Sequence, residues 1–301
     1  MKELSLSHLG ALVLSLLLWG TTFPALKGIL SMPGNPPLAL FFYRYFDSTV
    51  ILVIVVLIMK RGRSLRCPFR YYLLGILNFF AMAFQMEGLV LTTATKGAVL
   101  SQMVMVVVPF LSFLLLGENF SLRKLLAVFG ALSGAVMIST NLDFSGLLVR
   151  NSFQGDLLVS ASVLFWSLYI VLTRKWASHA DPISLLWASQ IPTVLLAFPA
   201  CLLTGQVHLT RQGHGAALFL GLICSLVTTV LYNYSLRRID ATTSTILGPI
   251  ELITALLISL FVLGEGFTLV ETAGSMIALC AALFAVVPSP ARFLPRPRKF
   301  W

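Results

Sequence analysis

Ten stretches of mostly apolar residues, separated by short polar breaks, run along the chain. A helix needs about 20 residues to cross a bilayer core of about 30 Å, and each stretch is roughly that long. We therefore predict ten transmembrane helices, near residues 9–31, 36–59, 70–91, 94–116, 122–142, 155–175, 183–205, 214–236, 240–263 and 268–287.

The apolar stretches are continuous, whereas the strands of a membrane β-barrel are short and alternate between apolar and polar residues. Of the 301 residues, 58% are apolar and 11% are charged. Soluble domains contain roughly 25% charged residues, so the composition excludes a soluble domain. The predicted fold class is all-α, a polytopic membrane protein. No long linker divides the chain, and we predict one membrane domain.

Sixteen of the 21 lysine and arginine residues fall on one side of the predicted membrane. Because cytoplasmic loops carry an excess of basic residues, both termini are predicted to be cytoplasmic, in a multi-pass protein of the cell (inner) membrane. The same distribution accounts for the net charge of +10 without a nucleic-acid partner. The sixteen are Lys2, Lys60, Arg61, Arg63, Arg66, Arg70, Arg123, Lys124, Arg174, Lys175, Arg237, Arg238, Arg292, Arg296, Arg298 and Lys299.

The four cysteines lie in or beside different predicted helices and lack the spacing of metal ligands. They are Cys67, Cys201, Cys224 and Cys280. We expect them to be packing residues, with neither a disulfide framework nor a metal site, and we predict no cofactor.

An internal repeat appears when the sequence is shifted by 147 positions against itself. The shift aligns Trp19 with Trp166, Ala94-Thr95 with Ala241-Thr242, Leu116-Gly117-Glu118 with Leu263-Gly264-Glu265, and Phe120 with Phe267. The predicted halves are residues 1–147 and 148–301, with five helices each. Because five is odd, the second half enters the membrane from the opposite side, so the repeats are inverted.

Inverted repeats have a mechanistic consequence. They give a protein two nearly equivalent ways to pack, each open to one side of the membrane, with a solute site near the midplane. The repeat therefore predicts a transporter that works by alternating access.

The chain resembles the drug/metabolite transporter superfamily, in its EamA-like ten-helix branch, over nearly its whole length. The resemblance is carried by Leu18-Trp19-Gly20, by the paired Leu-Gly-Glu motifs, and by the small-residue run Gly130-Ala131-Leu132-Ser133-Gly134. It implies two inverted halves around a central cavity and transport of metabolites such as amino acids, with export as our expectation. Two prolines expected from the family are replaced here by Met105 and Leu252.

Four ionisable residues lie at predicted membrane depth: Arg44, Asp47, Glu87 and Glu251. Each costs on the order of 3 kcal/mol to insert, so such residues usually have a partner or a function. Arg44 and Asp47 share a helix face, and an ion pair that fixes helix packing is one interpretation. The other is that Arg44 binds an anionic group of the solute and Asp47 neutralises it in the empty state. Glu87, near the outer end of its helix, is interpreted as a solvated vestibule residue or a ligand.

Glu251 is the first candidate for a proton or amine ligand. It follows Gly248-Pro249, where a flexible glycine and a missing N–H can open the helix toward a cavity. Glu251 and Asp47 are the candidate residues for proton coupling. A neutral carboxylic acid, hydrogen-bonded within the bundle, is the alternative for Glu251.

Polar and aromatic residues on other helices complete the predicted solute site. Trp19 and Trp166 occupy equivalent positions in the repeat, where an indole can stack on a solute or close a gate. The alternative for each residue is a helix-packing contact. The predicted binding residues are Trp19, Arg44, Asp47, Asn78, Gln102, Trp166, Tyr169, Tyr232 and Glu251.

The predicted function is secondary transport of a small polar solute across the bilayer. Protons are the candidate coupling ion. No Gly-rich phosphate loop is present for direct use of ATP. A membrane enzyme would need clustered catalytic groups, whereas His8, His179, His208 and His214 are scattered, so we predict no enzyme. A lipid-handling or structural subunit is the remaining alternative. The identity of the solute and the oligomeric state stay open.

Overall fold

The computed structural model describes residues 6–30, 32–59, 66–92, 100–118, 121–145, 153–258, 261 and 268–286. Within these ranges every regular element is a helix, which confirms the all-α prediction. The elements are α1 (Leu6–Gly20), α2 (Thr22–Leu30), α3 (Pro37–Ile58), η2 (Phe69–Tyr72), α4 (Leu73–Leu91), α6 (Val104–Leu116), α7 (Leu122–Thr140), α8 (Phe153–Ala177), α9 (Pro182–Thr204), α10 (Arg211–Phe219), η5 (Leu220–Val227), α11 (Thr228–Ser235), α12 (Ala241–Ile246), α13 (Pro249–Ile258) and α14 (Leu269–Val286).

In the described part of the chain, six helical segments are long and apolar enough to cross a membrane. They are Leu6–Leu30, Pro37–Ile58, Leu122–Thr140, Phe153–Ala177, Pro182–Thr204 and Arg211–Ser235. Val104–Leu116 and Leu269–Ala285 are shorter apolar helices. The polytopic prediction agrees with these segments, and the count of ten spans remains a prediction.

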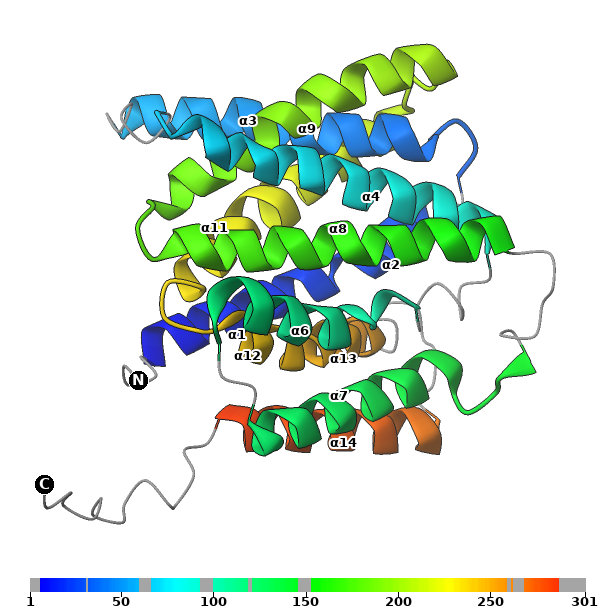
Figure 1. Cartoon of the computed structure of the whole chain (residues 1–301). Coiled ribbons are helices and arrows are strands. Elements are labelled where there is room, and N and C mark those ends of the chain that lie inside the picture. Colours follow the sequence, from blue (N-terminus) through cyan, green and yellow to red (C-terminus); the bar gives the residue numbers. More distant parts are fainter. Residues whose placement is uncertain are drawn as a thin grey trace, which may run out of the picture.

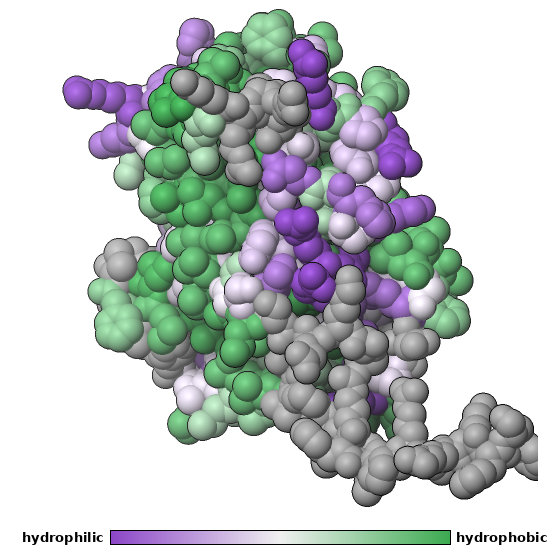
Figure 2. All heavy atoms as spheres, turned by 90° about the vertical axis from the view of Figure 1, so that its left-hand side faces the viewer, coloured by the Kyte–Doolittle hydropathy of each residue, from purple (hydrophilic) through white to green (hydrophobic). Residues whose placement is uncertain are grey.

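The helices form a bundle in which neighbours run side by side (Figure 1). The most extensive helix pairs are α7 with α14, α4 with α8, and α4 with α9. We call the end where α1 begins and α3, α8 and α11 end the basic end, and the opposite end, where α2 ends and α3 begins, the far end. Figure 2 looks onto the basic end and shows hydrophilic side chains gathered there between apolar ones.

Local sequence signals explain where many helices begin and end. The Ser121 hydroxyl accepts a hydrogen bond from the Lys124 N–H, and Asp240 accepts one from the Thr243 N–H, so both residues cap helix N-termini. Gly117 and Gly205 follow α6 and α9 in the left-handed conformation, with φ of 63° and 69°. Glycine adopts this conformation without a steric penalty, so these residues end their helices.

Two segments depart from regular α-helix near the centre of the bundle. Leu220–Val227 forms a π-helix between α10 and α11, and such stretches occur often at functional sites. The helix that contains Glu251 is interrupted at Leu247 and Gly248, between α12 and α13. A break in the helix thus lies beside Gly248-Pro249, as predicted, and the Gly248 N–H donates to the Thr245 carbonyl at 2.9 Å; an opening of the backbone toward a cavity stays a prediction.

Small residues allow α7 and α14 to pack closely. A Cβ atom added at Gly134 would lie 2.5 Å from the Gly274 carbonyl oxygen and 2.8 Å from the Ala278 Cβ. Close approach of this kind is the usual way in which membrane helices gain packing contacts. The run Gly130 to Gly134 is therefore a helix-packing surface.

The substitution Gly134→Ala should lower the free energy of unfolding by about 1–3 kcal/mol, because the methyl group meets backbone that must move. The matched control is Gly10→Ala, since a Cβ at Gly10 meets nothing within 4 Å. That change should leave stability unchanged or raise it, as alanine is the better helix former. Thermal unfolding in detergent measures both, and equal effects would contradict this account of the packing.

Candidate solute-binding site

A cavity of about 540 Å³ lies between the helices at the centre of the bundle. Residues of α1, α2, α3, α4, α6, α8, α11, α12 and α13 line it, together with Cys224 of the π-helix. Eight of the nine predicted binding residues are among them: Trp19, Arg44, Asn78, Gln102, Trp166, Tyr169, Tyr232 and Glu251. Side chains far apart in the sequence thus share one space.

Arg44 is 5% exposed on α3, yet it borders the cavity. Its Nε donates a hydrogen bond of 2.7 Å to the Ser225 hydroxyl, and its guanidinium carbon lies 5.6 Å from the centre of the Tyr45 ring. Both contacts orient the guanidinium, and among the described residues no carboxylate forms an ion pair with it. A buried cation without a direct counter-ion is a strong binding group for an anion.

Asp47 is half-buried on α3 and is not among the residues that line the cavity. Three residues along an α-helix turn the side chain by about 300°, so Asp47 lies about 60° around the helix from Arg44. In the described part of the chain the two residues form no ion pair, and Ser225 is the partner of Arg44. The structure therefore supports neither an Arg44–Asp47 ion pair that fixes helix packing nor neutralisation of Arg44 by Asp47 in the empty state.

Glu251 lies in the first turn of α13, where the partial positive charge of the helix N-terminus favours an anion. The backbone at Glu251 packs closely against α1, since a Cβ atom added at Gly20 would lie 2.7 Å from the Glu251 carbonyl oxygen. Its carboxylate makes no hydrogen bond or ion pair with another described side chain, although it feels the charge of Arg44. Arg44 and Glu251 thus line one cavity without a direct contact between them.

Aromatic side chains form the wall on the side of the basic end. Trp19 donates through Nε1 to the Cys224 carbonyl oxygen at 2.8 Å, and its ring lies 5.0 Å from that of Tyr232. The Tyr232 hydroxyl is 3.2 Å from the Ser244 hydroxyl. The carbonyl of Cys224 belongs to the π-helix, so this irregular segment helps to position Trp19.

The repeat-equivalent tryptophan, Trp166, is held in a similar way. Its Nε1 donates to Gln85 Oε1 at 3.3 Å, and its ring is perpendicular to that of Tyr169 at a centroid distance of 5.6 Å. Both indoles therefore have fixed orientations at the cavity surface. Their ring faces suit stacking on an apolar or cationic part of a solute.

Asn78 forms hydrogen bonds with its neighbours, which agrees with the alternative interpretation of this residue as a helix-packing contact. The Tyr45 hydroxyl donates to Asn78 Oδ1 at 3.3 Å, and Asn78 Nδ2 donates to the Thr193 hydroxyl at 3.0 Å. Glu87 is half-buried on α4 and is not among the lining residues. Asn78 thus positions Tyr45, and Glu87 lies outside the cavity.

Several residues of the site escaped the sequence analysis. Ser225 orients Arg44, Tyr45 stacks beside it, and Ser244 contacts Tyr232. One signal for Ser244 was present, since the polar run Ala241–Ile246 lies inside an apolar stretch and is wholly buried. No sequence signal marks Ser225, because its partner is 181 residues away.

Two ion pairs of the described residues join helix ends toward the basic end of the bundle. Lys124 Nζ lies 2.8 Å from Asp240 Oδ1, and Arg174 Nε lies 3.5 Å from Glu118 Oε1. Each pair joins a residue before position 147 with one after it. Glu118 also accepts a hydrogen bond from the Ala241 N–H at 3.3 Å. Burial, together with repulsion from Asp240, raises the pKa of the Glu118 carboxyl. Of the two acids in these ion pairs, Glu118 and Asp240, the negative charge of Glu118 is therefore the less well compensated.

Comparison with known proteins identifies the kind of protein that shares this architecture. The model of the EamA-like transporter family matches two stretches of the chain, residues 6–140 and 153–287. A solved crystal structure with 17% sequence identity covers 93% of this chain and 96% of its own, with a TM-score of 0.79, so the fold is shared.

Two relatives, both more similar in sequence to this chain than that structure is, are named as transporters. An uncharacterized transporter of Archaeoglobus fulgidus is 25% identical over 273 residues, which cover 90% of this chain and 83% of the relative. An S-adenosylmethionine uptake transporter of Rickettsia prowazekii is 26% identical over 250 residues, which cover 82% of this chain and 81% of the relative.

Proposed function

This chain belongs to the EamA-like transporter family, and we propose that it moves amino acids or related zwitterionic metabolites across the cell membrane by alternating access. The observation that carries the proposal is the separation of Arg44 and Glu251 within one cavity, each without a counter-ion among the described side chains. A solute with a carboxylate and an ammonium group can satisfy both residues at once. A solute with one charge leaves the other residue unpaired and buried, which is costly.

The proposed mechanism uses two inverted five-helix halves, residues 1–147 and 148–301. The double match of one family model supports this division. The cavity is lined by Leu30 and Pro37 at the far end, whereas the two ion pairs lie toward the basic end. If the basic end is cytoplasmic, as the positive-inside rule predicts, we propose that this conformation opens to the outside. Access from the cytoplasm then requires the ion pairs to separate.

Protons are the coupling ion that we propose, with Glu251 as the proton carrier. Its carboxylate is directed to the cavity and has no fixed partner among the described residues, so solute and proton compete for it directly. Asp47 lies outside the lining residues, and we therefore assign the coupling to Glu251 alone.

Counterflow in proteoliposomes tests the proposal. Liposomes loaded with an unlabelled solute should accumulate the same labelled solute, and only for molecules with both a carboxylate and an amine. The panel contains amino acids, S-adenosylmethionine, organic acids, amines and nucleosides, each with and without a pH gradient, and protein-free liposomes are the control. Transport of organic acids and amines as well as amino acids would contradict the zwitterion proposal. Absence of transport by folded protein would favour a lipid-handling role.

The direction that we propose is export. The Rickettsia relative is named as an uptake transporter, so direction needs its own measurement. Export predicts that cells lacking the protein retain more of the solute after loading, and uptake predicts that they acquire less.

The ion pairs at the basic end should control access to the cavity from that side. Asp240→Asn keeps a side chain that can cap α12 but removes the charge that binds Lys124. Because a partly exposed pair contributes about 0.2–1 kcal/mol, opening toward the basic end should increase by up to about fivefold. To measure this opening, Ser244→Cys is introduced into a variant that lacks the native cysteines. An impermeant maleimide added from the basic end then labels the new cysteine when the cavity is open to that end.

Two further variants make the measurement specific. Lys124→Gln should increase labelling as much as Asp240→Asn, and the double variant should add nothing more. Glu118→Gln should change labelling less, since burial already opposes the charge of that carboxyl. Additive effects of Lys124→Gln and Asp240→Asn would disprove a role for their contact.

A further inference from the structure

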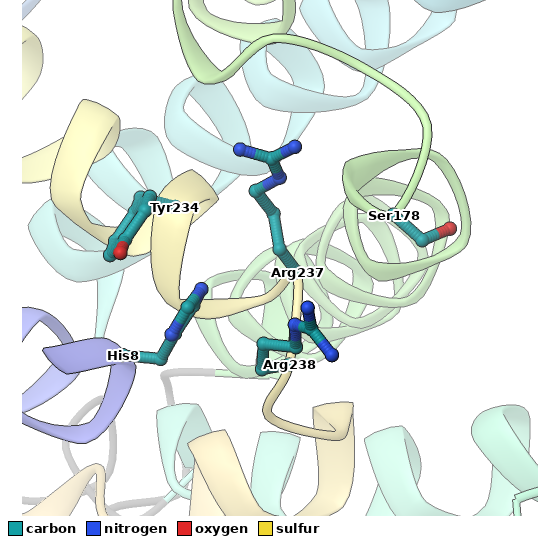
Figure 3. A pocket seen from close by; sticks show the side chains of 5 residues that line it. All are labelled: His8, Ser178, Tyr234, Arg237 and Arg238. Carbon is teal, nitrogen blue, oxygen red and sulfur yellow. The ribbon is translucent and has the colours of Figure 1, made fainter. Parts of the chain in front are cut away.

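A second cavity, of about 280 Å³, lies at the basic end, apart from the central cavity. His8 of α1, Ser178 after α8, Tyr234 of α11, and Arg237 and Arg238 after α11 line it (Figure 3). We call it the basic-end pocket. None of its five residues lines the central cavity, and nothing in the proposed transport mechanism requires it.

The pocket carries positive charge without compensation. Arg237 and Arg238 are adjacent in the turn between α11 and α12, and neither forms an ion pair with an acid of the described chain. The acid closest in sequence, Asp240, is engaged by Lys124 and by the N-terminus of α12. Figure 3 shows the two guanidinium groups directed to different sides of the turn, so each is available to an anion, which both charges attract.

The backbone that carries the two arginines is held in place. The Arg237 N–H donates to the Tyr234 carbonyl at 3.2 Å, and the Arg238 N–H donates to the Ser235 carbonyl at 3.1 Å. Arg174 donates through Nη1 to the Leu236 carbonyl oxygen, which ties the turn to α8. Little further ordering of the backbone is needed for binding, and preorganisation of this kind favours affinity.

One wall of the pocket is a stacked aromatic pair. The His8 and Tyr234 rings lie 4.3 Å apart at an angle of 11°, and Figure 3 shows them side by side, on one side of the two arginines. His8 Nδ1 is 3.3 Å from the Ser7 hydroxyl, which leaves Nε2 as the ring nitrogen for another ligand. The Ser178 hydroxyl adds a donor from the end of α8.

We propose that the basic-end pocket binds a phosphate group, with Arg237 and Arg238 as its charged ligands and His8 beside them. Arginine matches the oxygens of a phosphate with two parallel hydrogen bonds, which makes it well suited to this ligand. The volume is just below the range of about 300–1,000 Å³ typical of small-molecule sites, so it suits a head group or a small phosphate compound.

The phosphate can come from an anionic lipid or from a soluble compound, and both have the same chemistry at the pocket. For a lipid, acyl chains need apolar surface nearby, and Leu6, two residues before His8, is 84% exposed. If the basic end is cytoplasmic, it faces the leaflet surface where basic segments attract anionic lipids.

The experiment uses the full chain purified in a neutral detergent. Thermal unfolding is followed while dihexanoyl phosphatidylglycerol, dihexanoyl phosphatidylcholine or inorganic phosphate is added, with chloride at equal ionic strength as the reference. Stabilisation by phosphatidylglycerol alone identifies a lipid head group, and stabilisation by inorganic phosphate identifies a soluble phosphate compound. No stabilisation by either would overturn the proposal.

Variants decide whether an effect belongs to the pocket. The Arg237→Gln/Arg238→Gln double variant should bind the effective ligand at least about tenfold more weakly, since two charge-assisted hydrogen-bonding groups are lost. Arg66→Gln/Lys175→Gln is the matched control, because both residues are exposed, are absent from the lining of the pocket, and remove the same net charge. That control should bind normally. Equal weakening in both double variants means non-specific attraction and rejects the site.

A milder variant keeps the test valid if the double variant does not fold. Arg238→Lys retains the charge but loses the planar group that binds two oxygens. It should weaken binding of the effective ligand by about threefold or more while the melting temperature without ligand stays near that of the wild type. Unchanged affinity in Arg238→Lys together with unchanged affinity in His8→Gln would count against the pocket.

Discussion

Replacing Glu251 with glutamine should reduce the rate of counterflow at least about tenfold. Glutamine has nearly the same shape but carries no charge, and a hydrogen bond to a charged group contributes about 1.5–3 kcal/mol. The amine of a zwitterionic solute then loses its counter-ion in the cavity. Initial rates in proteoliposomes measure the effect, and the melting temperature shows whether the variant is folded.

The same variant separates the two roles proposed for Glu251. If the residue carries the proton but does not hold the solute, Glu251→Gln keeps solute exchange and loses accumulation driven by a pH gradient. If it also binds the amine, both activities fall. Glu87→Gln is the control, since Glu87 lies outside the lining of the cavity, and it should transport normally. Wild-type behaviour of Glu251→Gln in both assays would remove Glu251 from the mechanism.

Replacing Arg44 with glutamine should abolish discrimination in favour of solutes with a carboxylate. Transport of an amino acid should fall about tenfold or more, because the carboxylate loses a charge-assisted partner in a buried site. The wild type should not accumulate the corresponding amino acid amide, which lacks the carboxylate, so the amide gives the lower limit of transport and the wild-type rate for the acid gives the upper limit. Arg44→Lys should lie between these limits, since lysine keeps the charge but not the planar geometry.

Two neighbours of Arg44 provide controls. Asp47→Asn should have little effect on transport, because Asp47 does not line the cavity. Ser225→Ala should weaken transport of the carboxylate solute moderately, since the hydroxyl that orients Arg44 is removed. If Arg44→Gln slows transport of the acid only in proportion to a loss of folded protein, shown by a lower melting temperature, Arg44 stabilises the bundle and does not select the solute.

The elements of the fold could be predicted well because a bilayer imposes a simple rule on sequence. Predicted helices at 36–59, 155–175 and 183–205 agree within two residues with Pro37–Ile58, Phe153–Ala177 and Pro182–Thr204. Ala94-Thr95 and the second Leu-Gly-Glu motif, residues 263–265, lie outside the described residues. Local chemistry also predicted the interruption at Gly248-Pro249, since a residue without an N–H disrupts a helix wherever it lies.

The directions of side chains could be predicted less well. Arg44 and Asp47 are neighbours in sequence, and spacing alone allowed them to form a pair. The choice between the pair and the contact with Ser225 depends on the helix that packs beside α3, which the spacing does not specify. The π-helix at Leu220–Val227 is a similar case, because its apolar sequence is compatible with an ordinary α-helix.

By itself the sequence determined that this chain is helical and membrane-embedded, and which few charged residues need an explanation, because lipid penalises every polar group that lacks a partner. Only the tertiary structure decided which of them share a space. It separated Asp47 from the cavity, joined Glu118 to the start of α12, and gathered His8, Arg237 and Arg238 around a second pocket. The physical reason is that such contacts join residues more than a hundred positions apart, and they depend on helix rotation and packing distance, which hydrophobic periodicity leaves free.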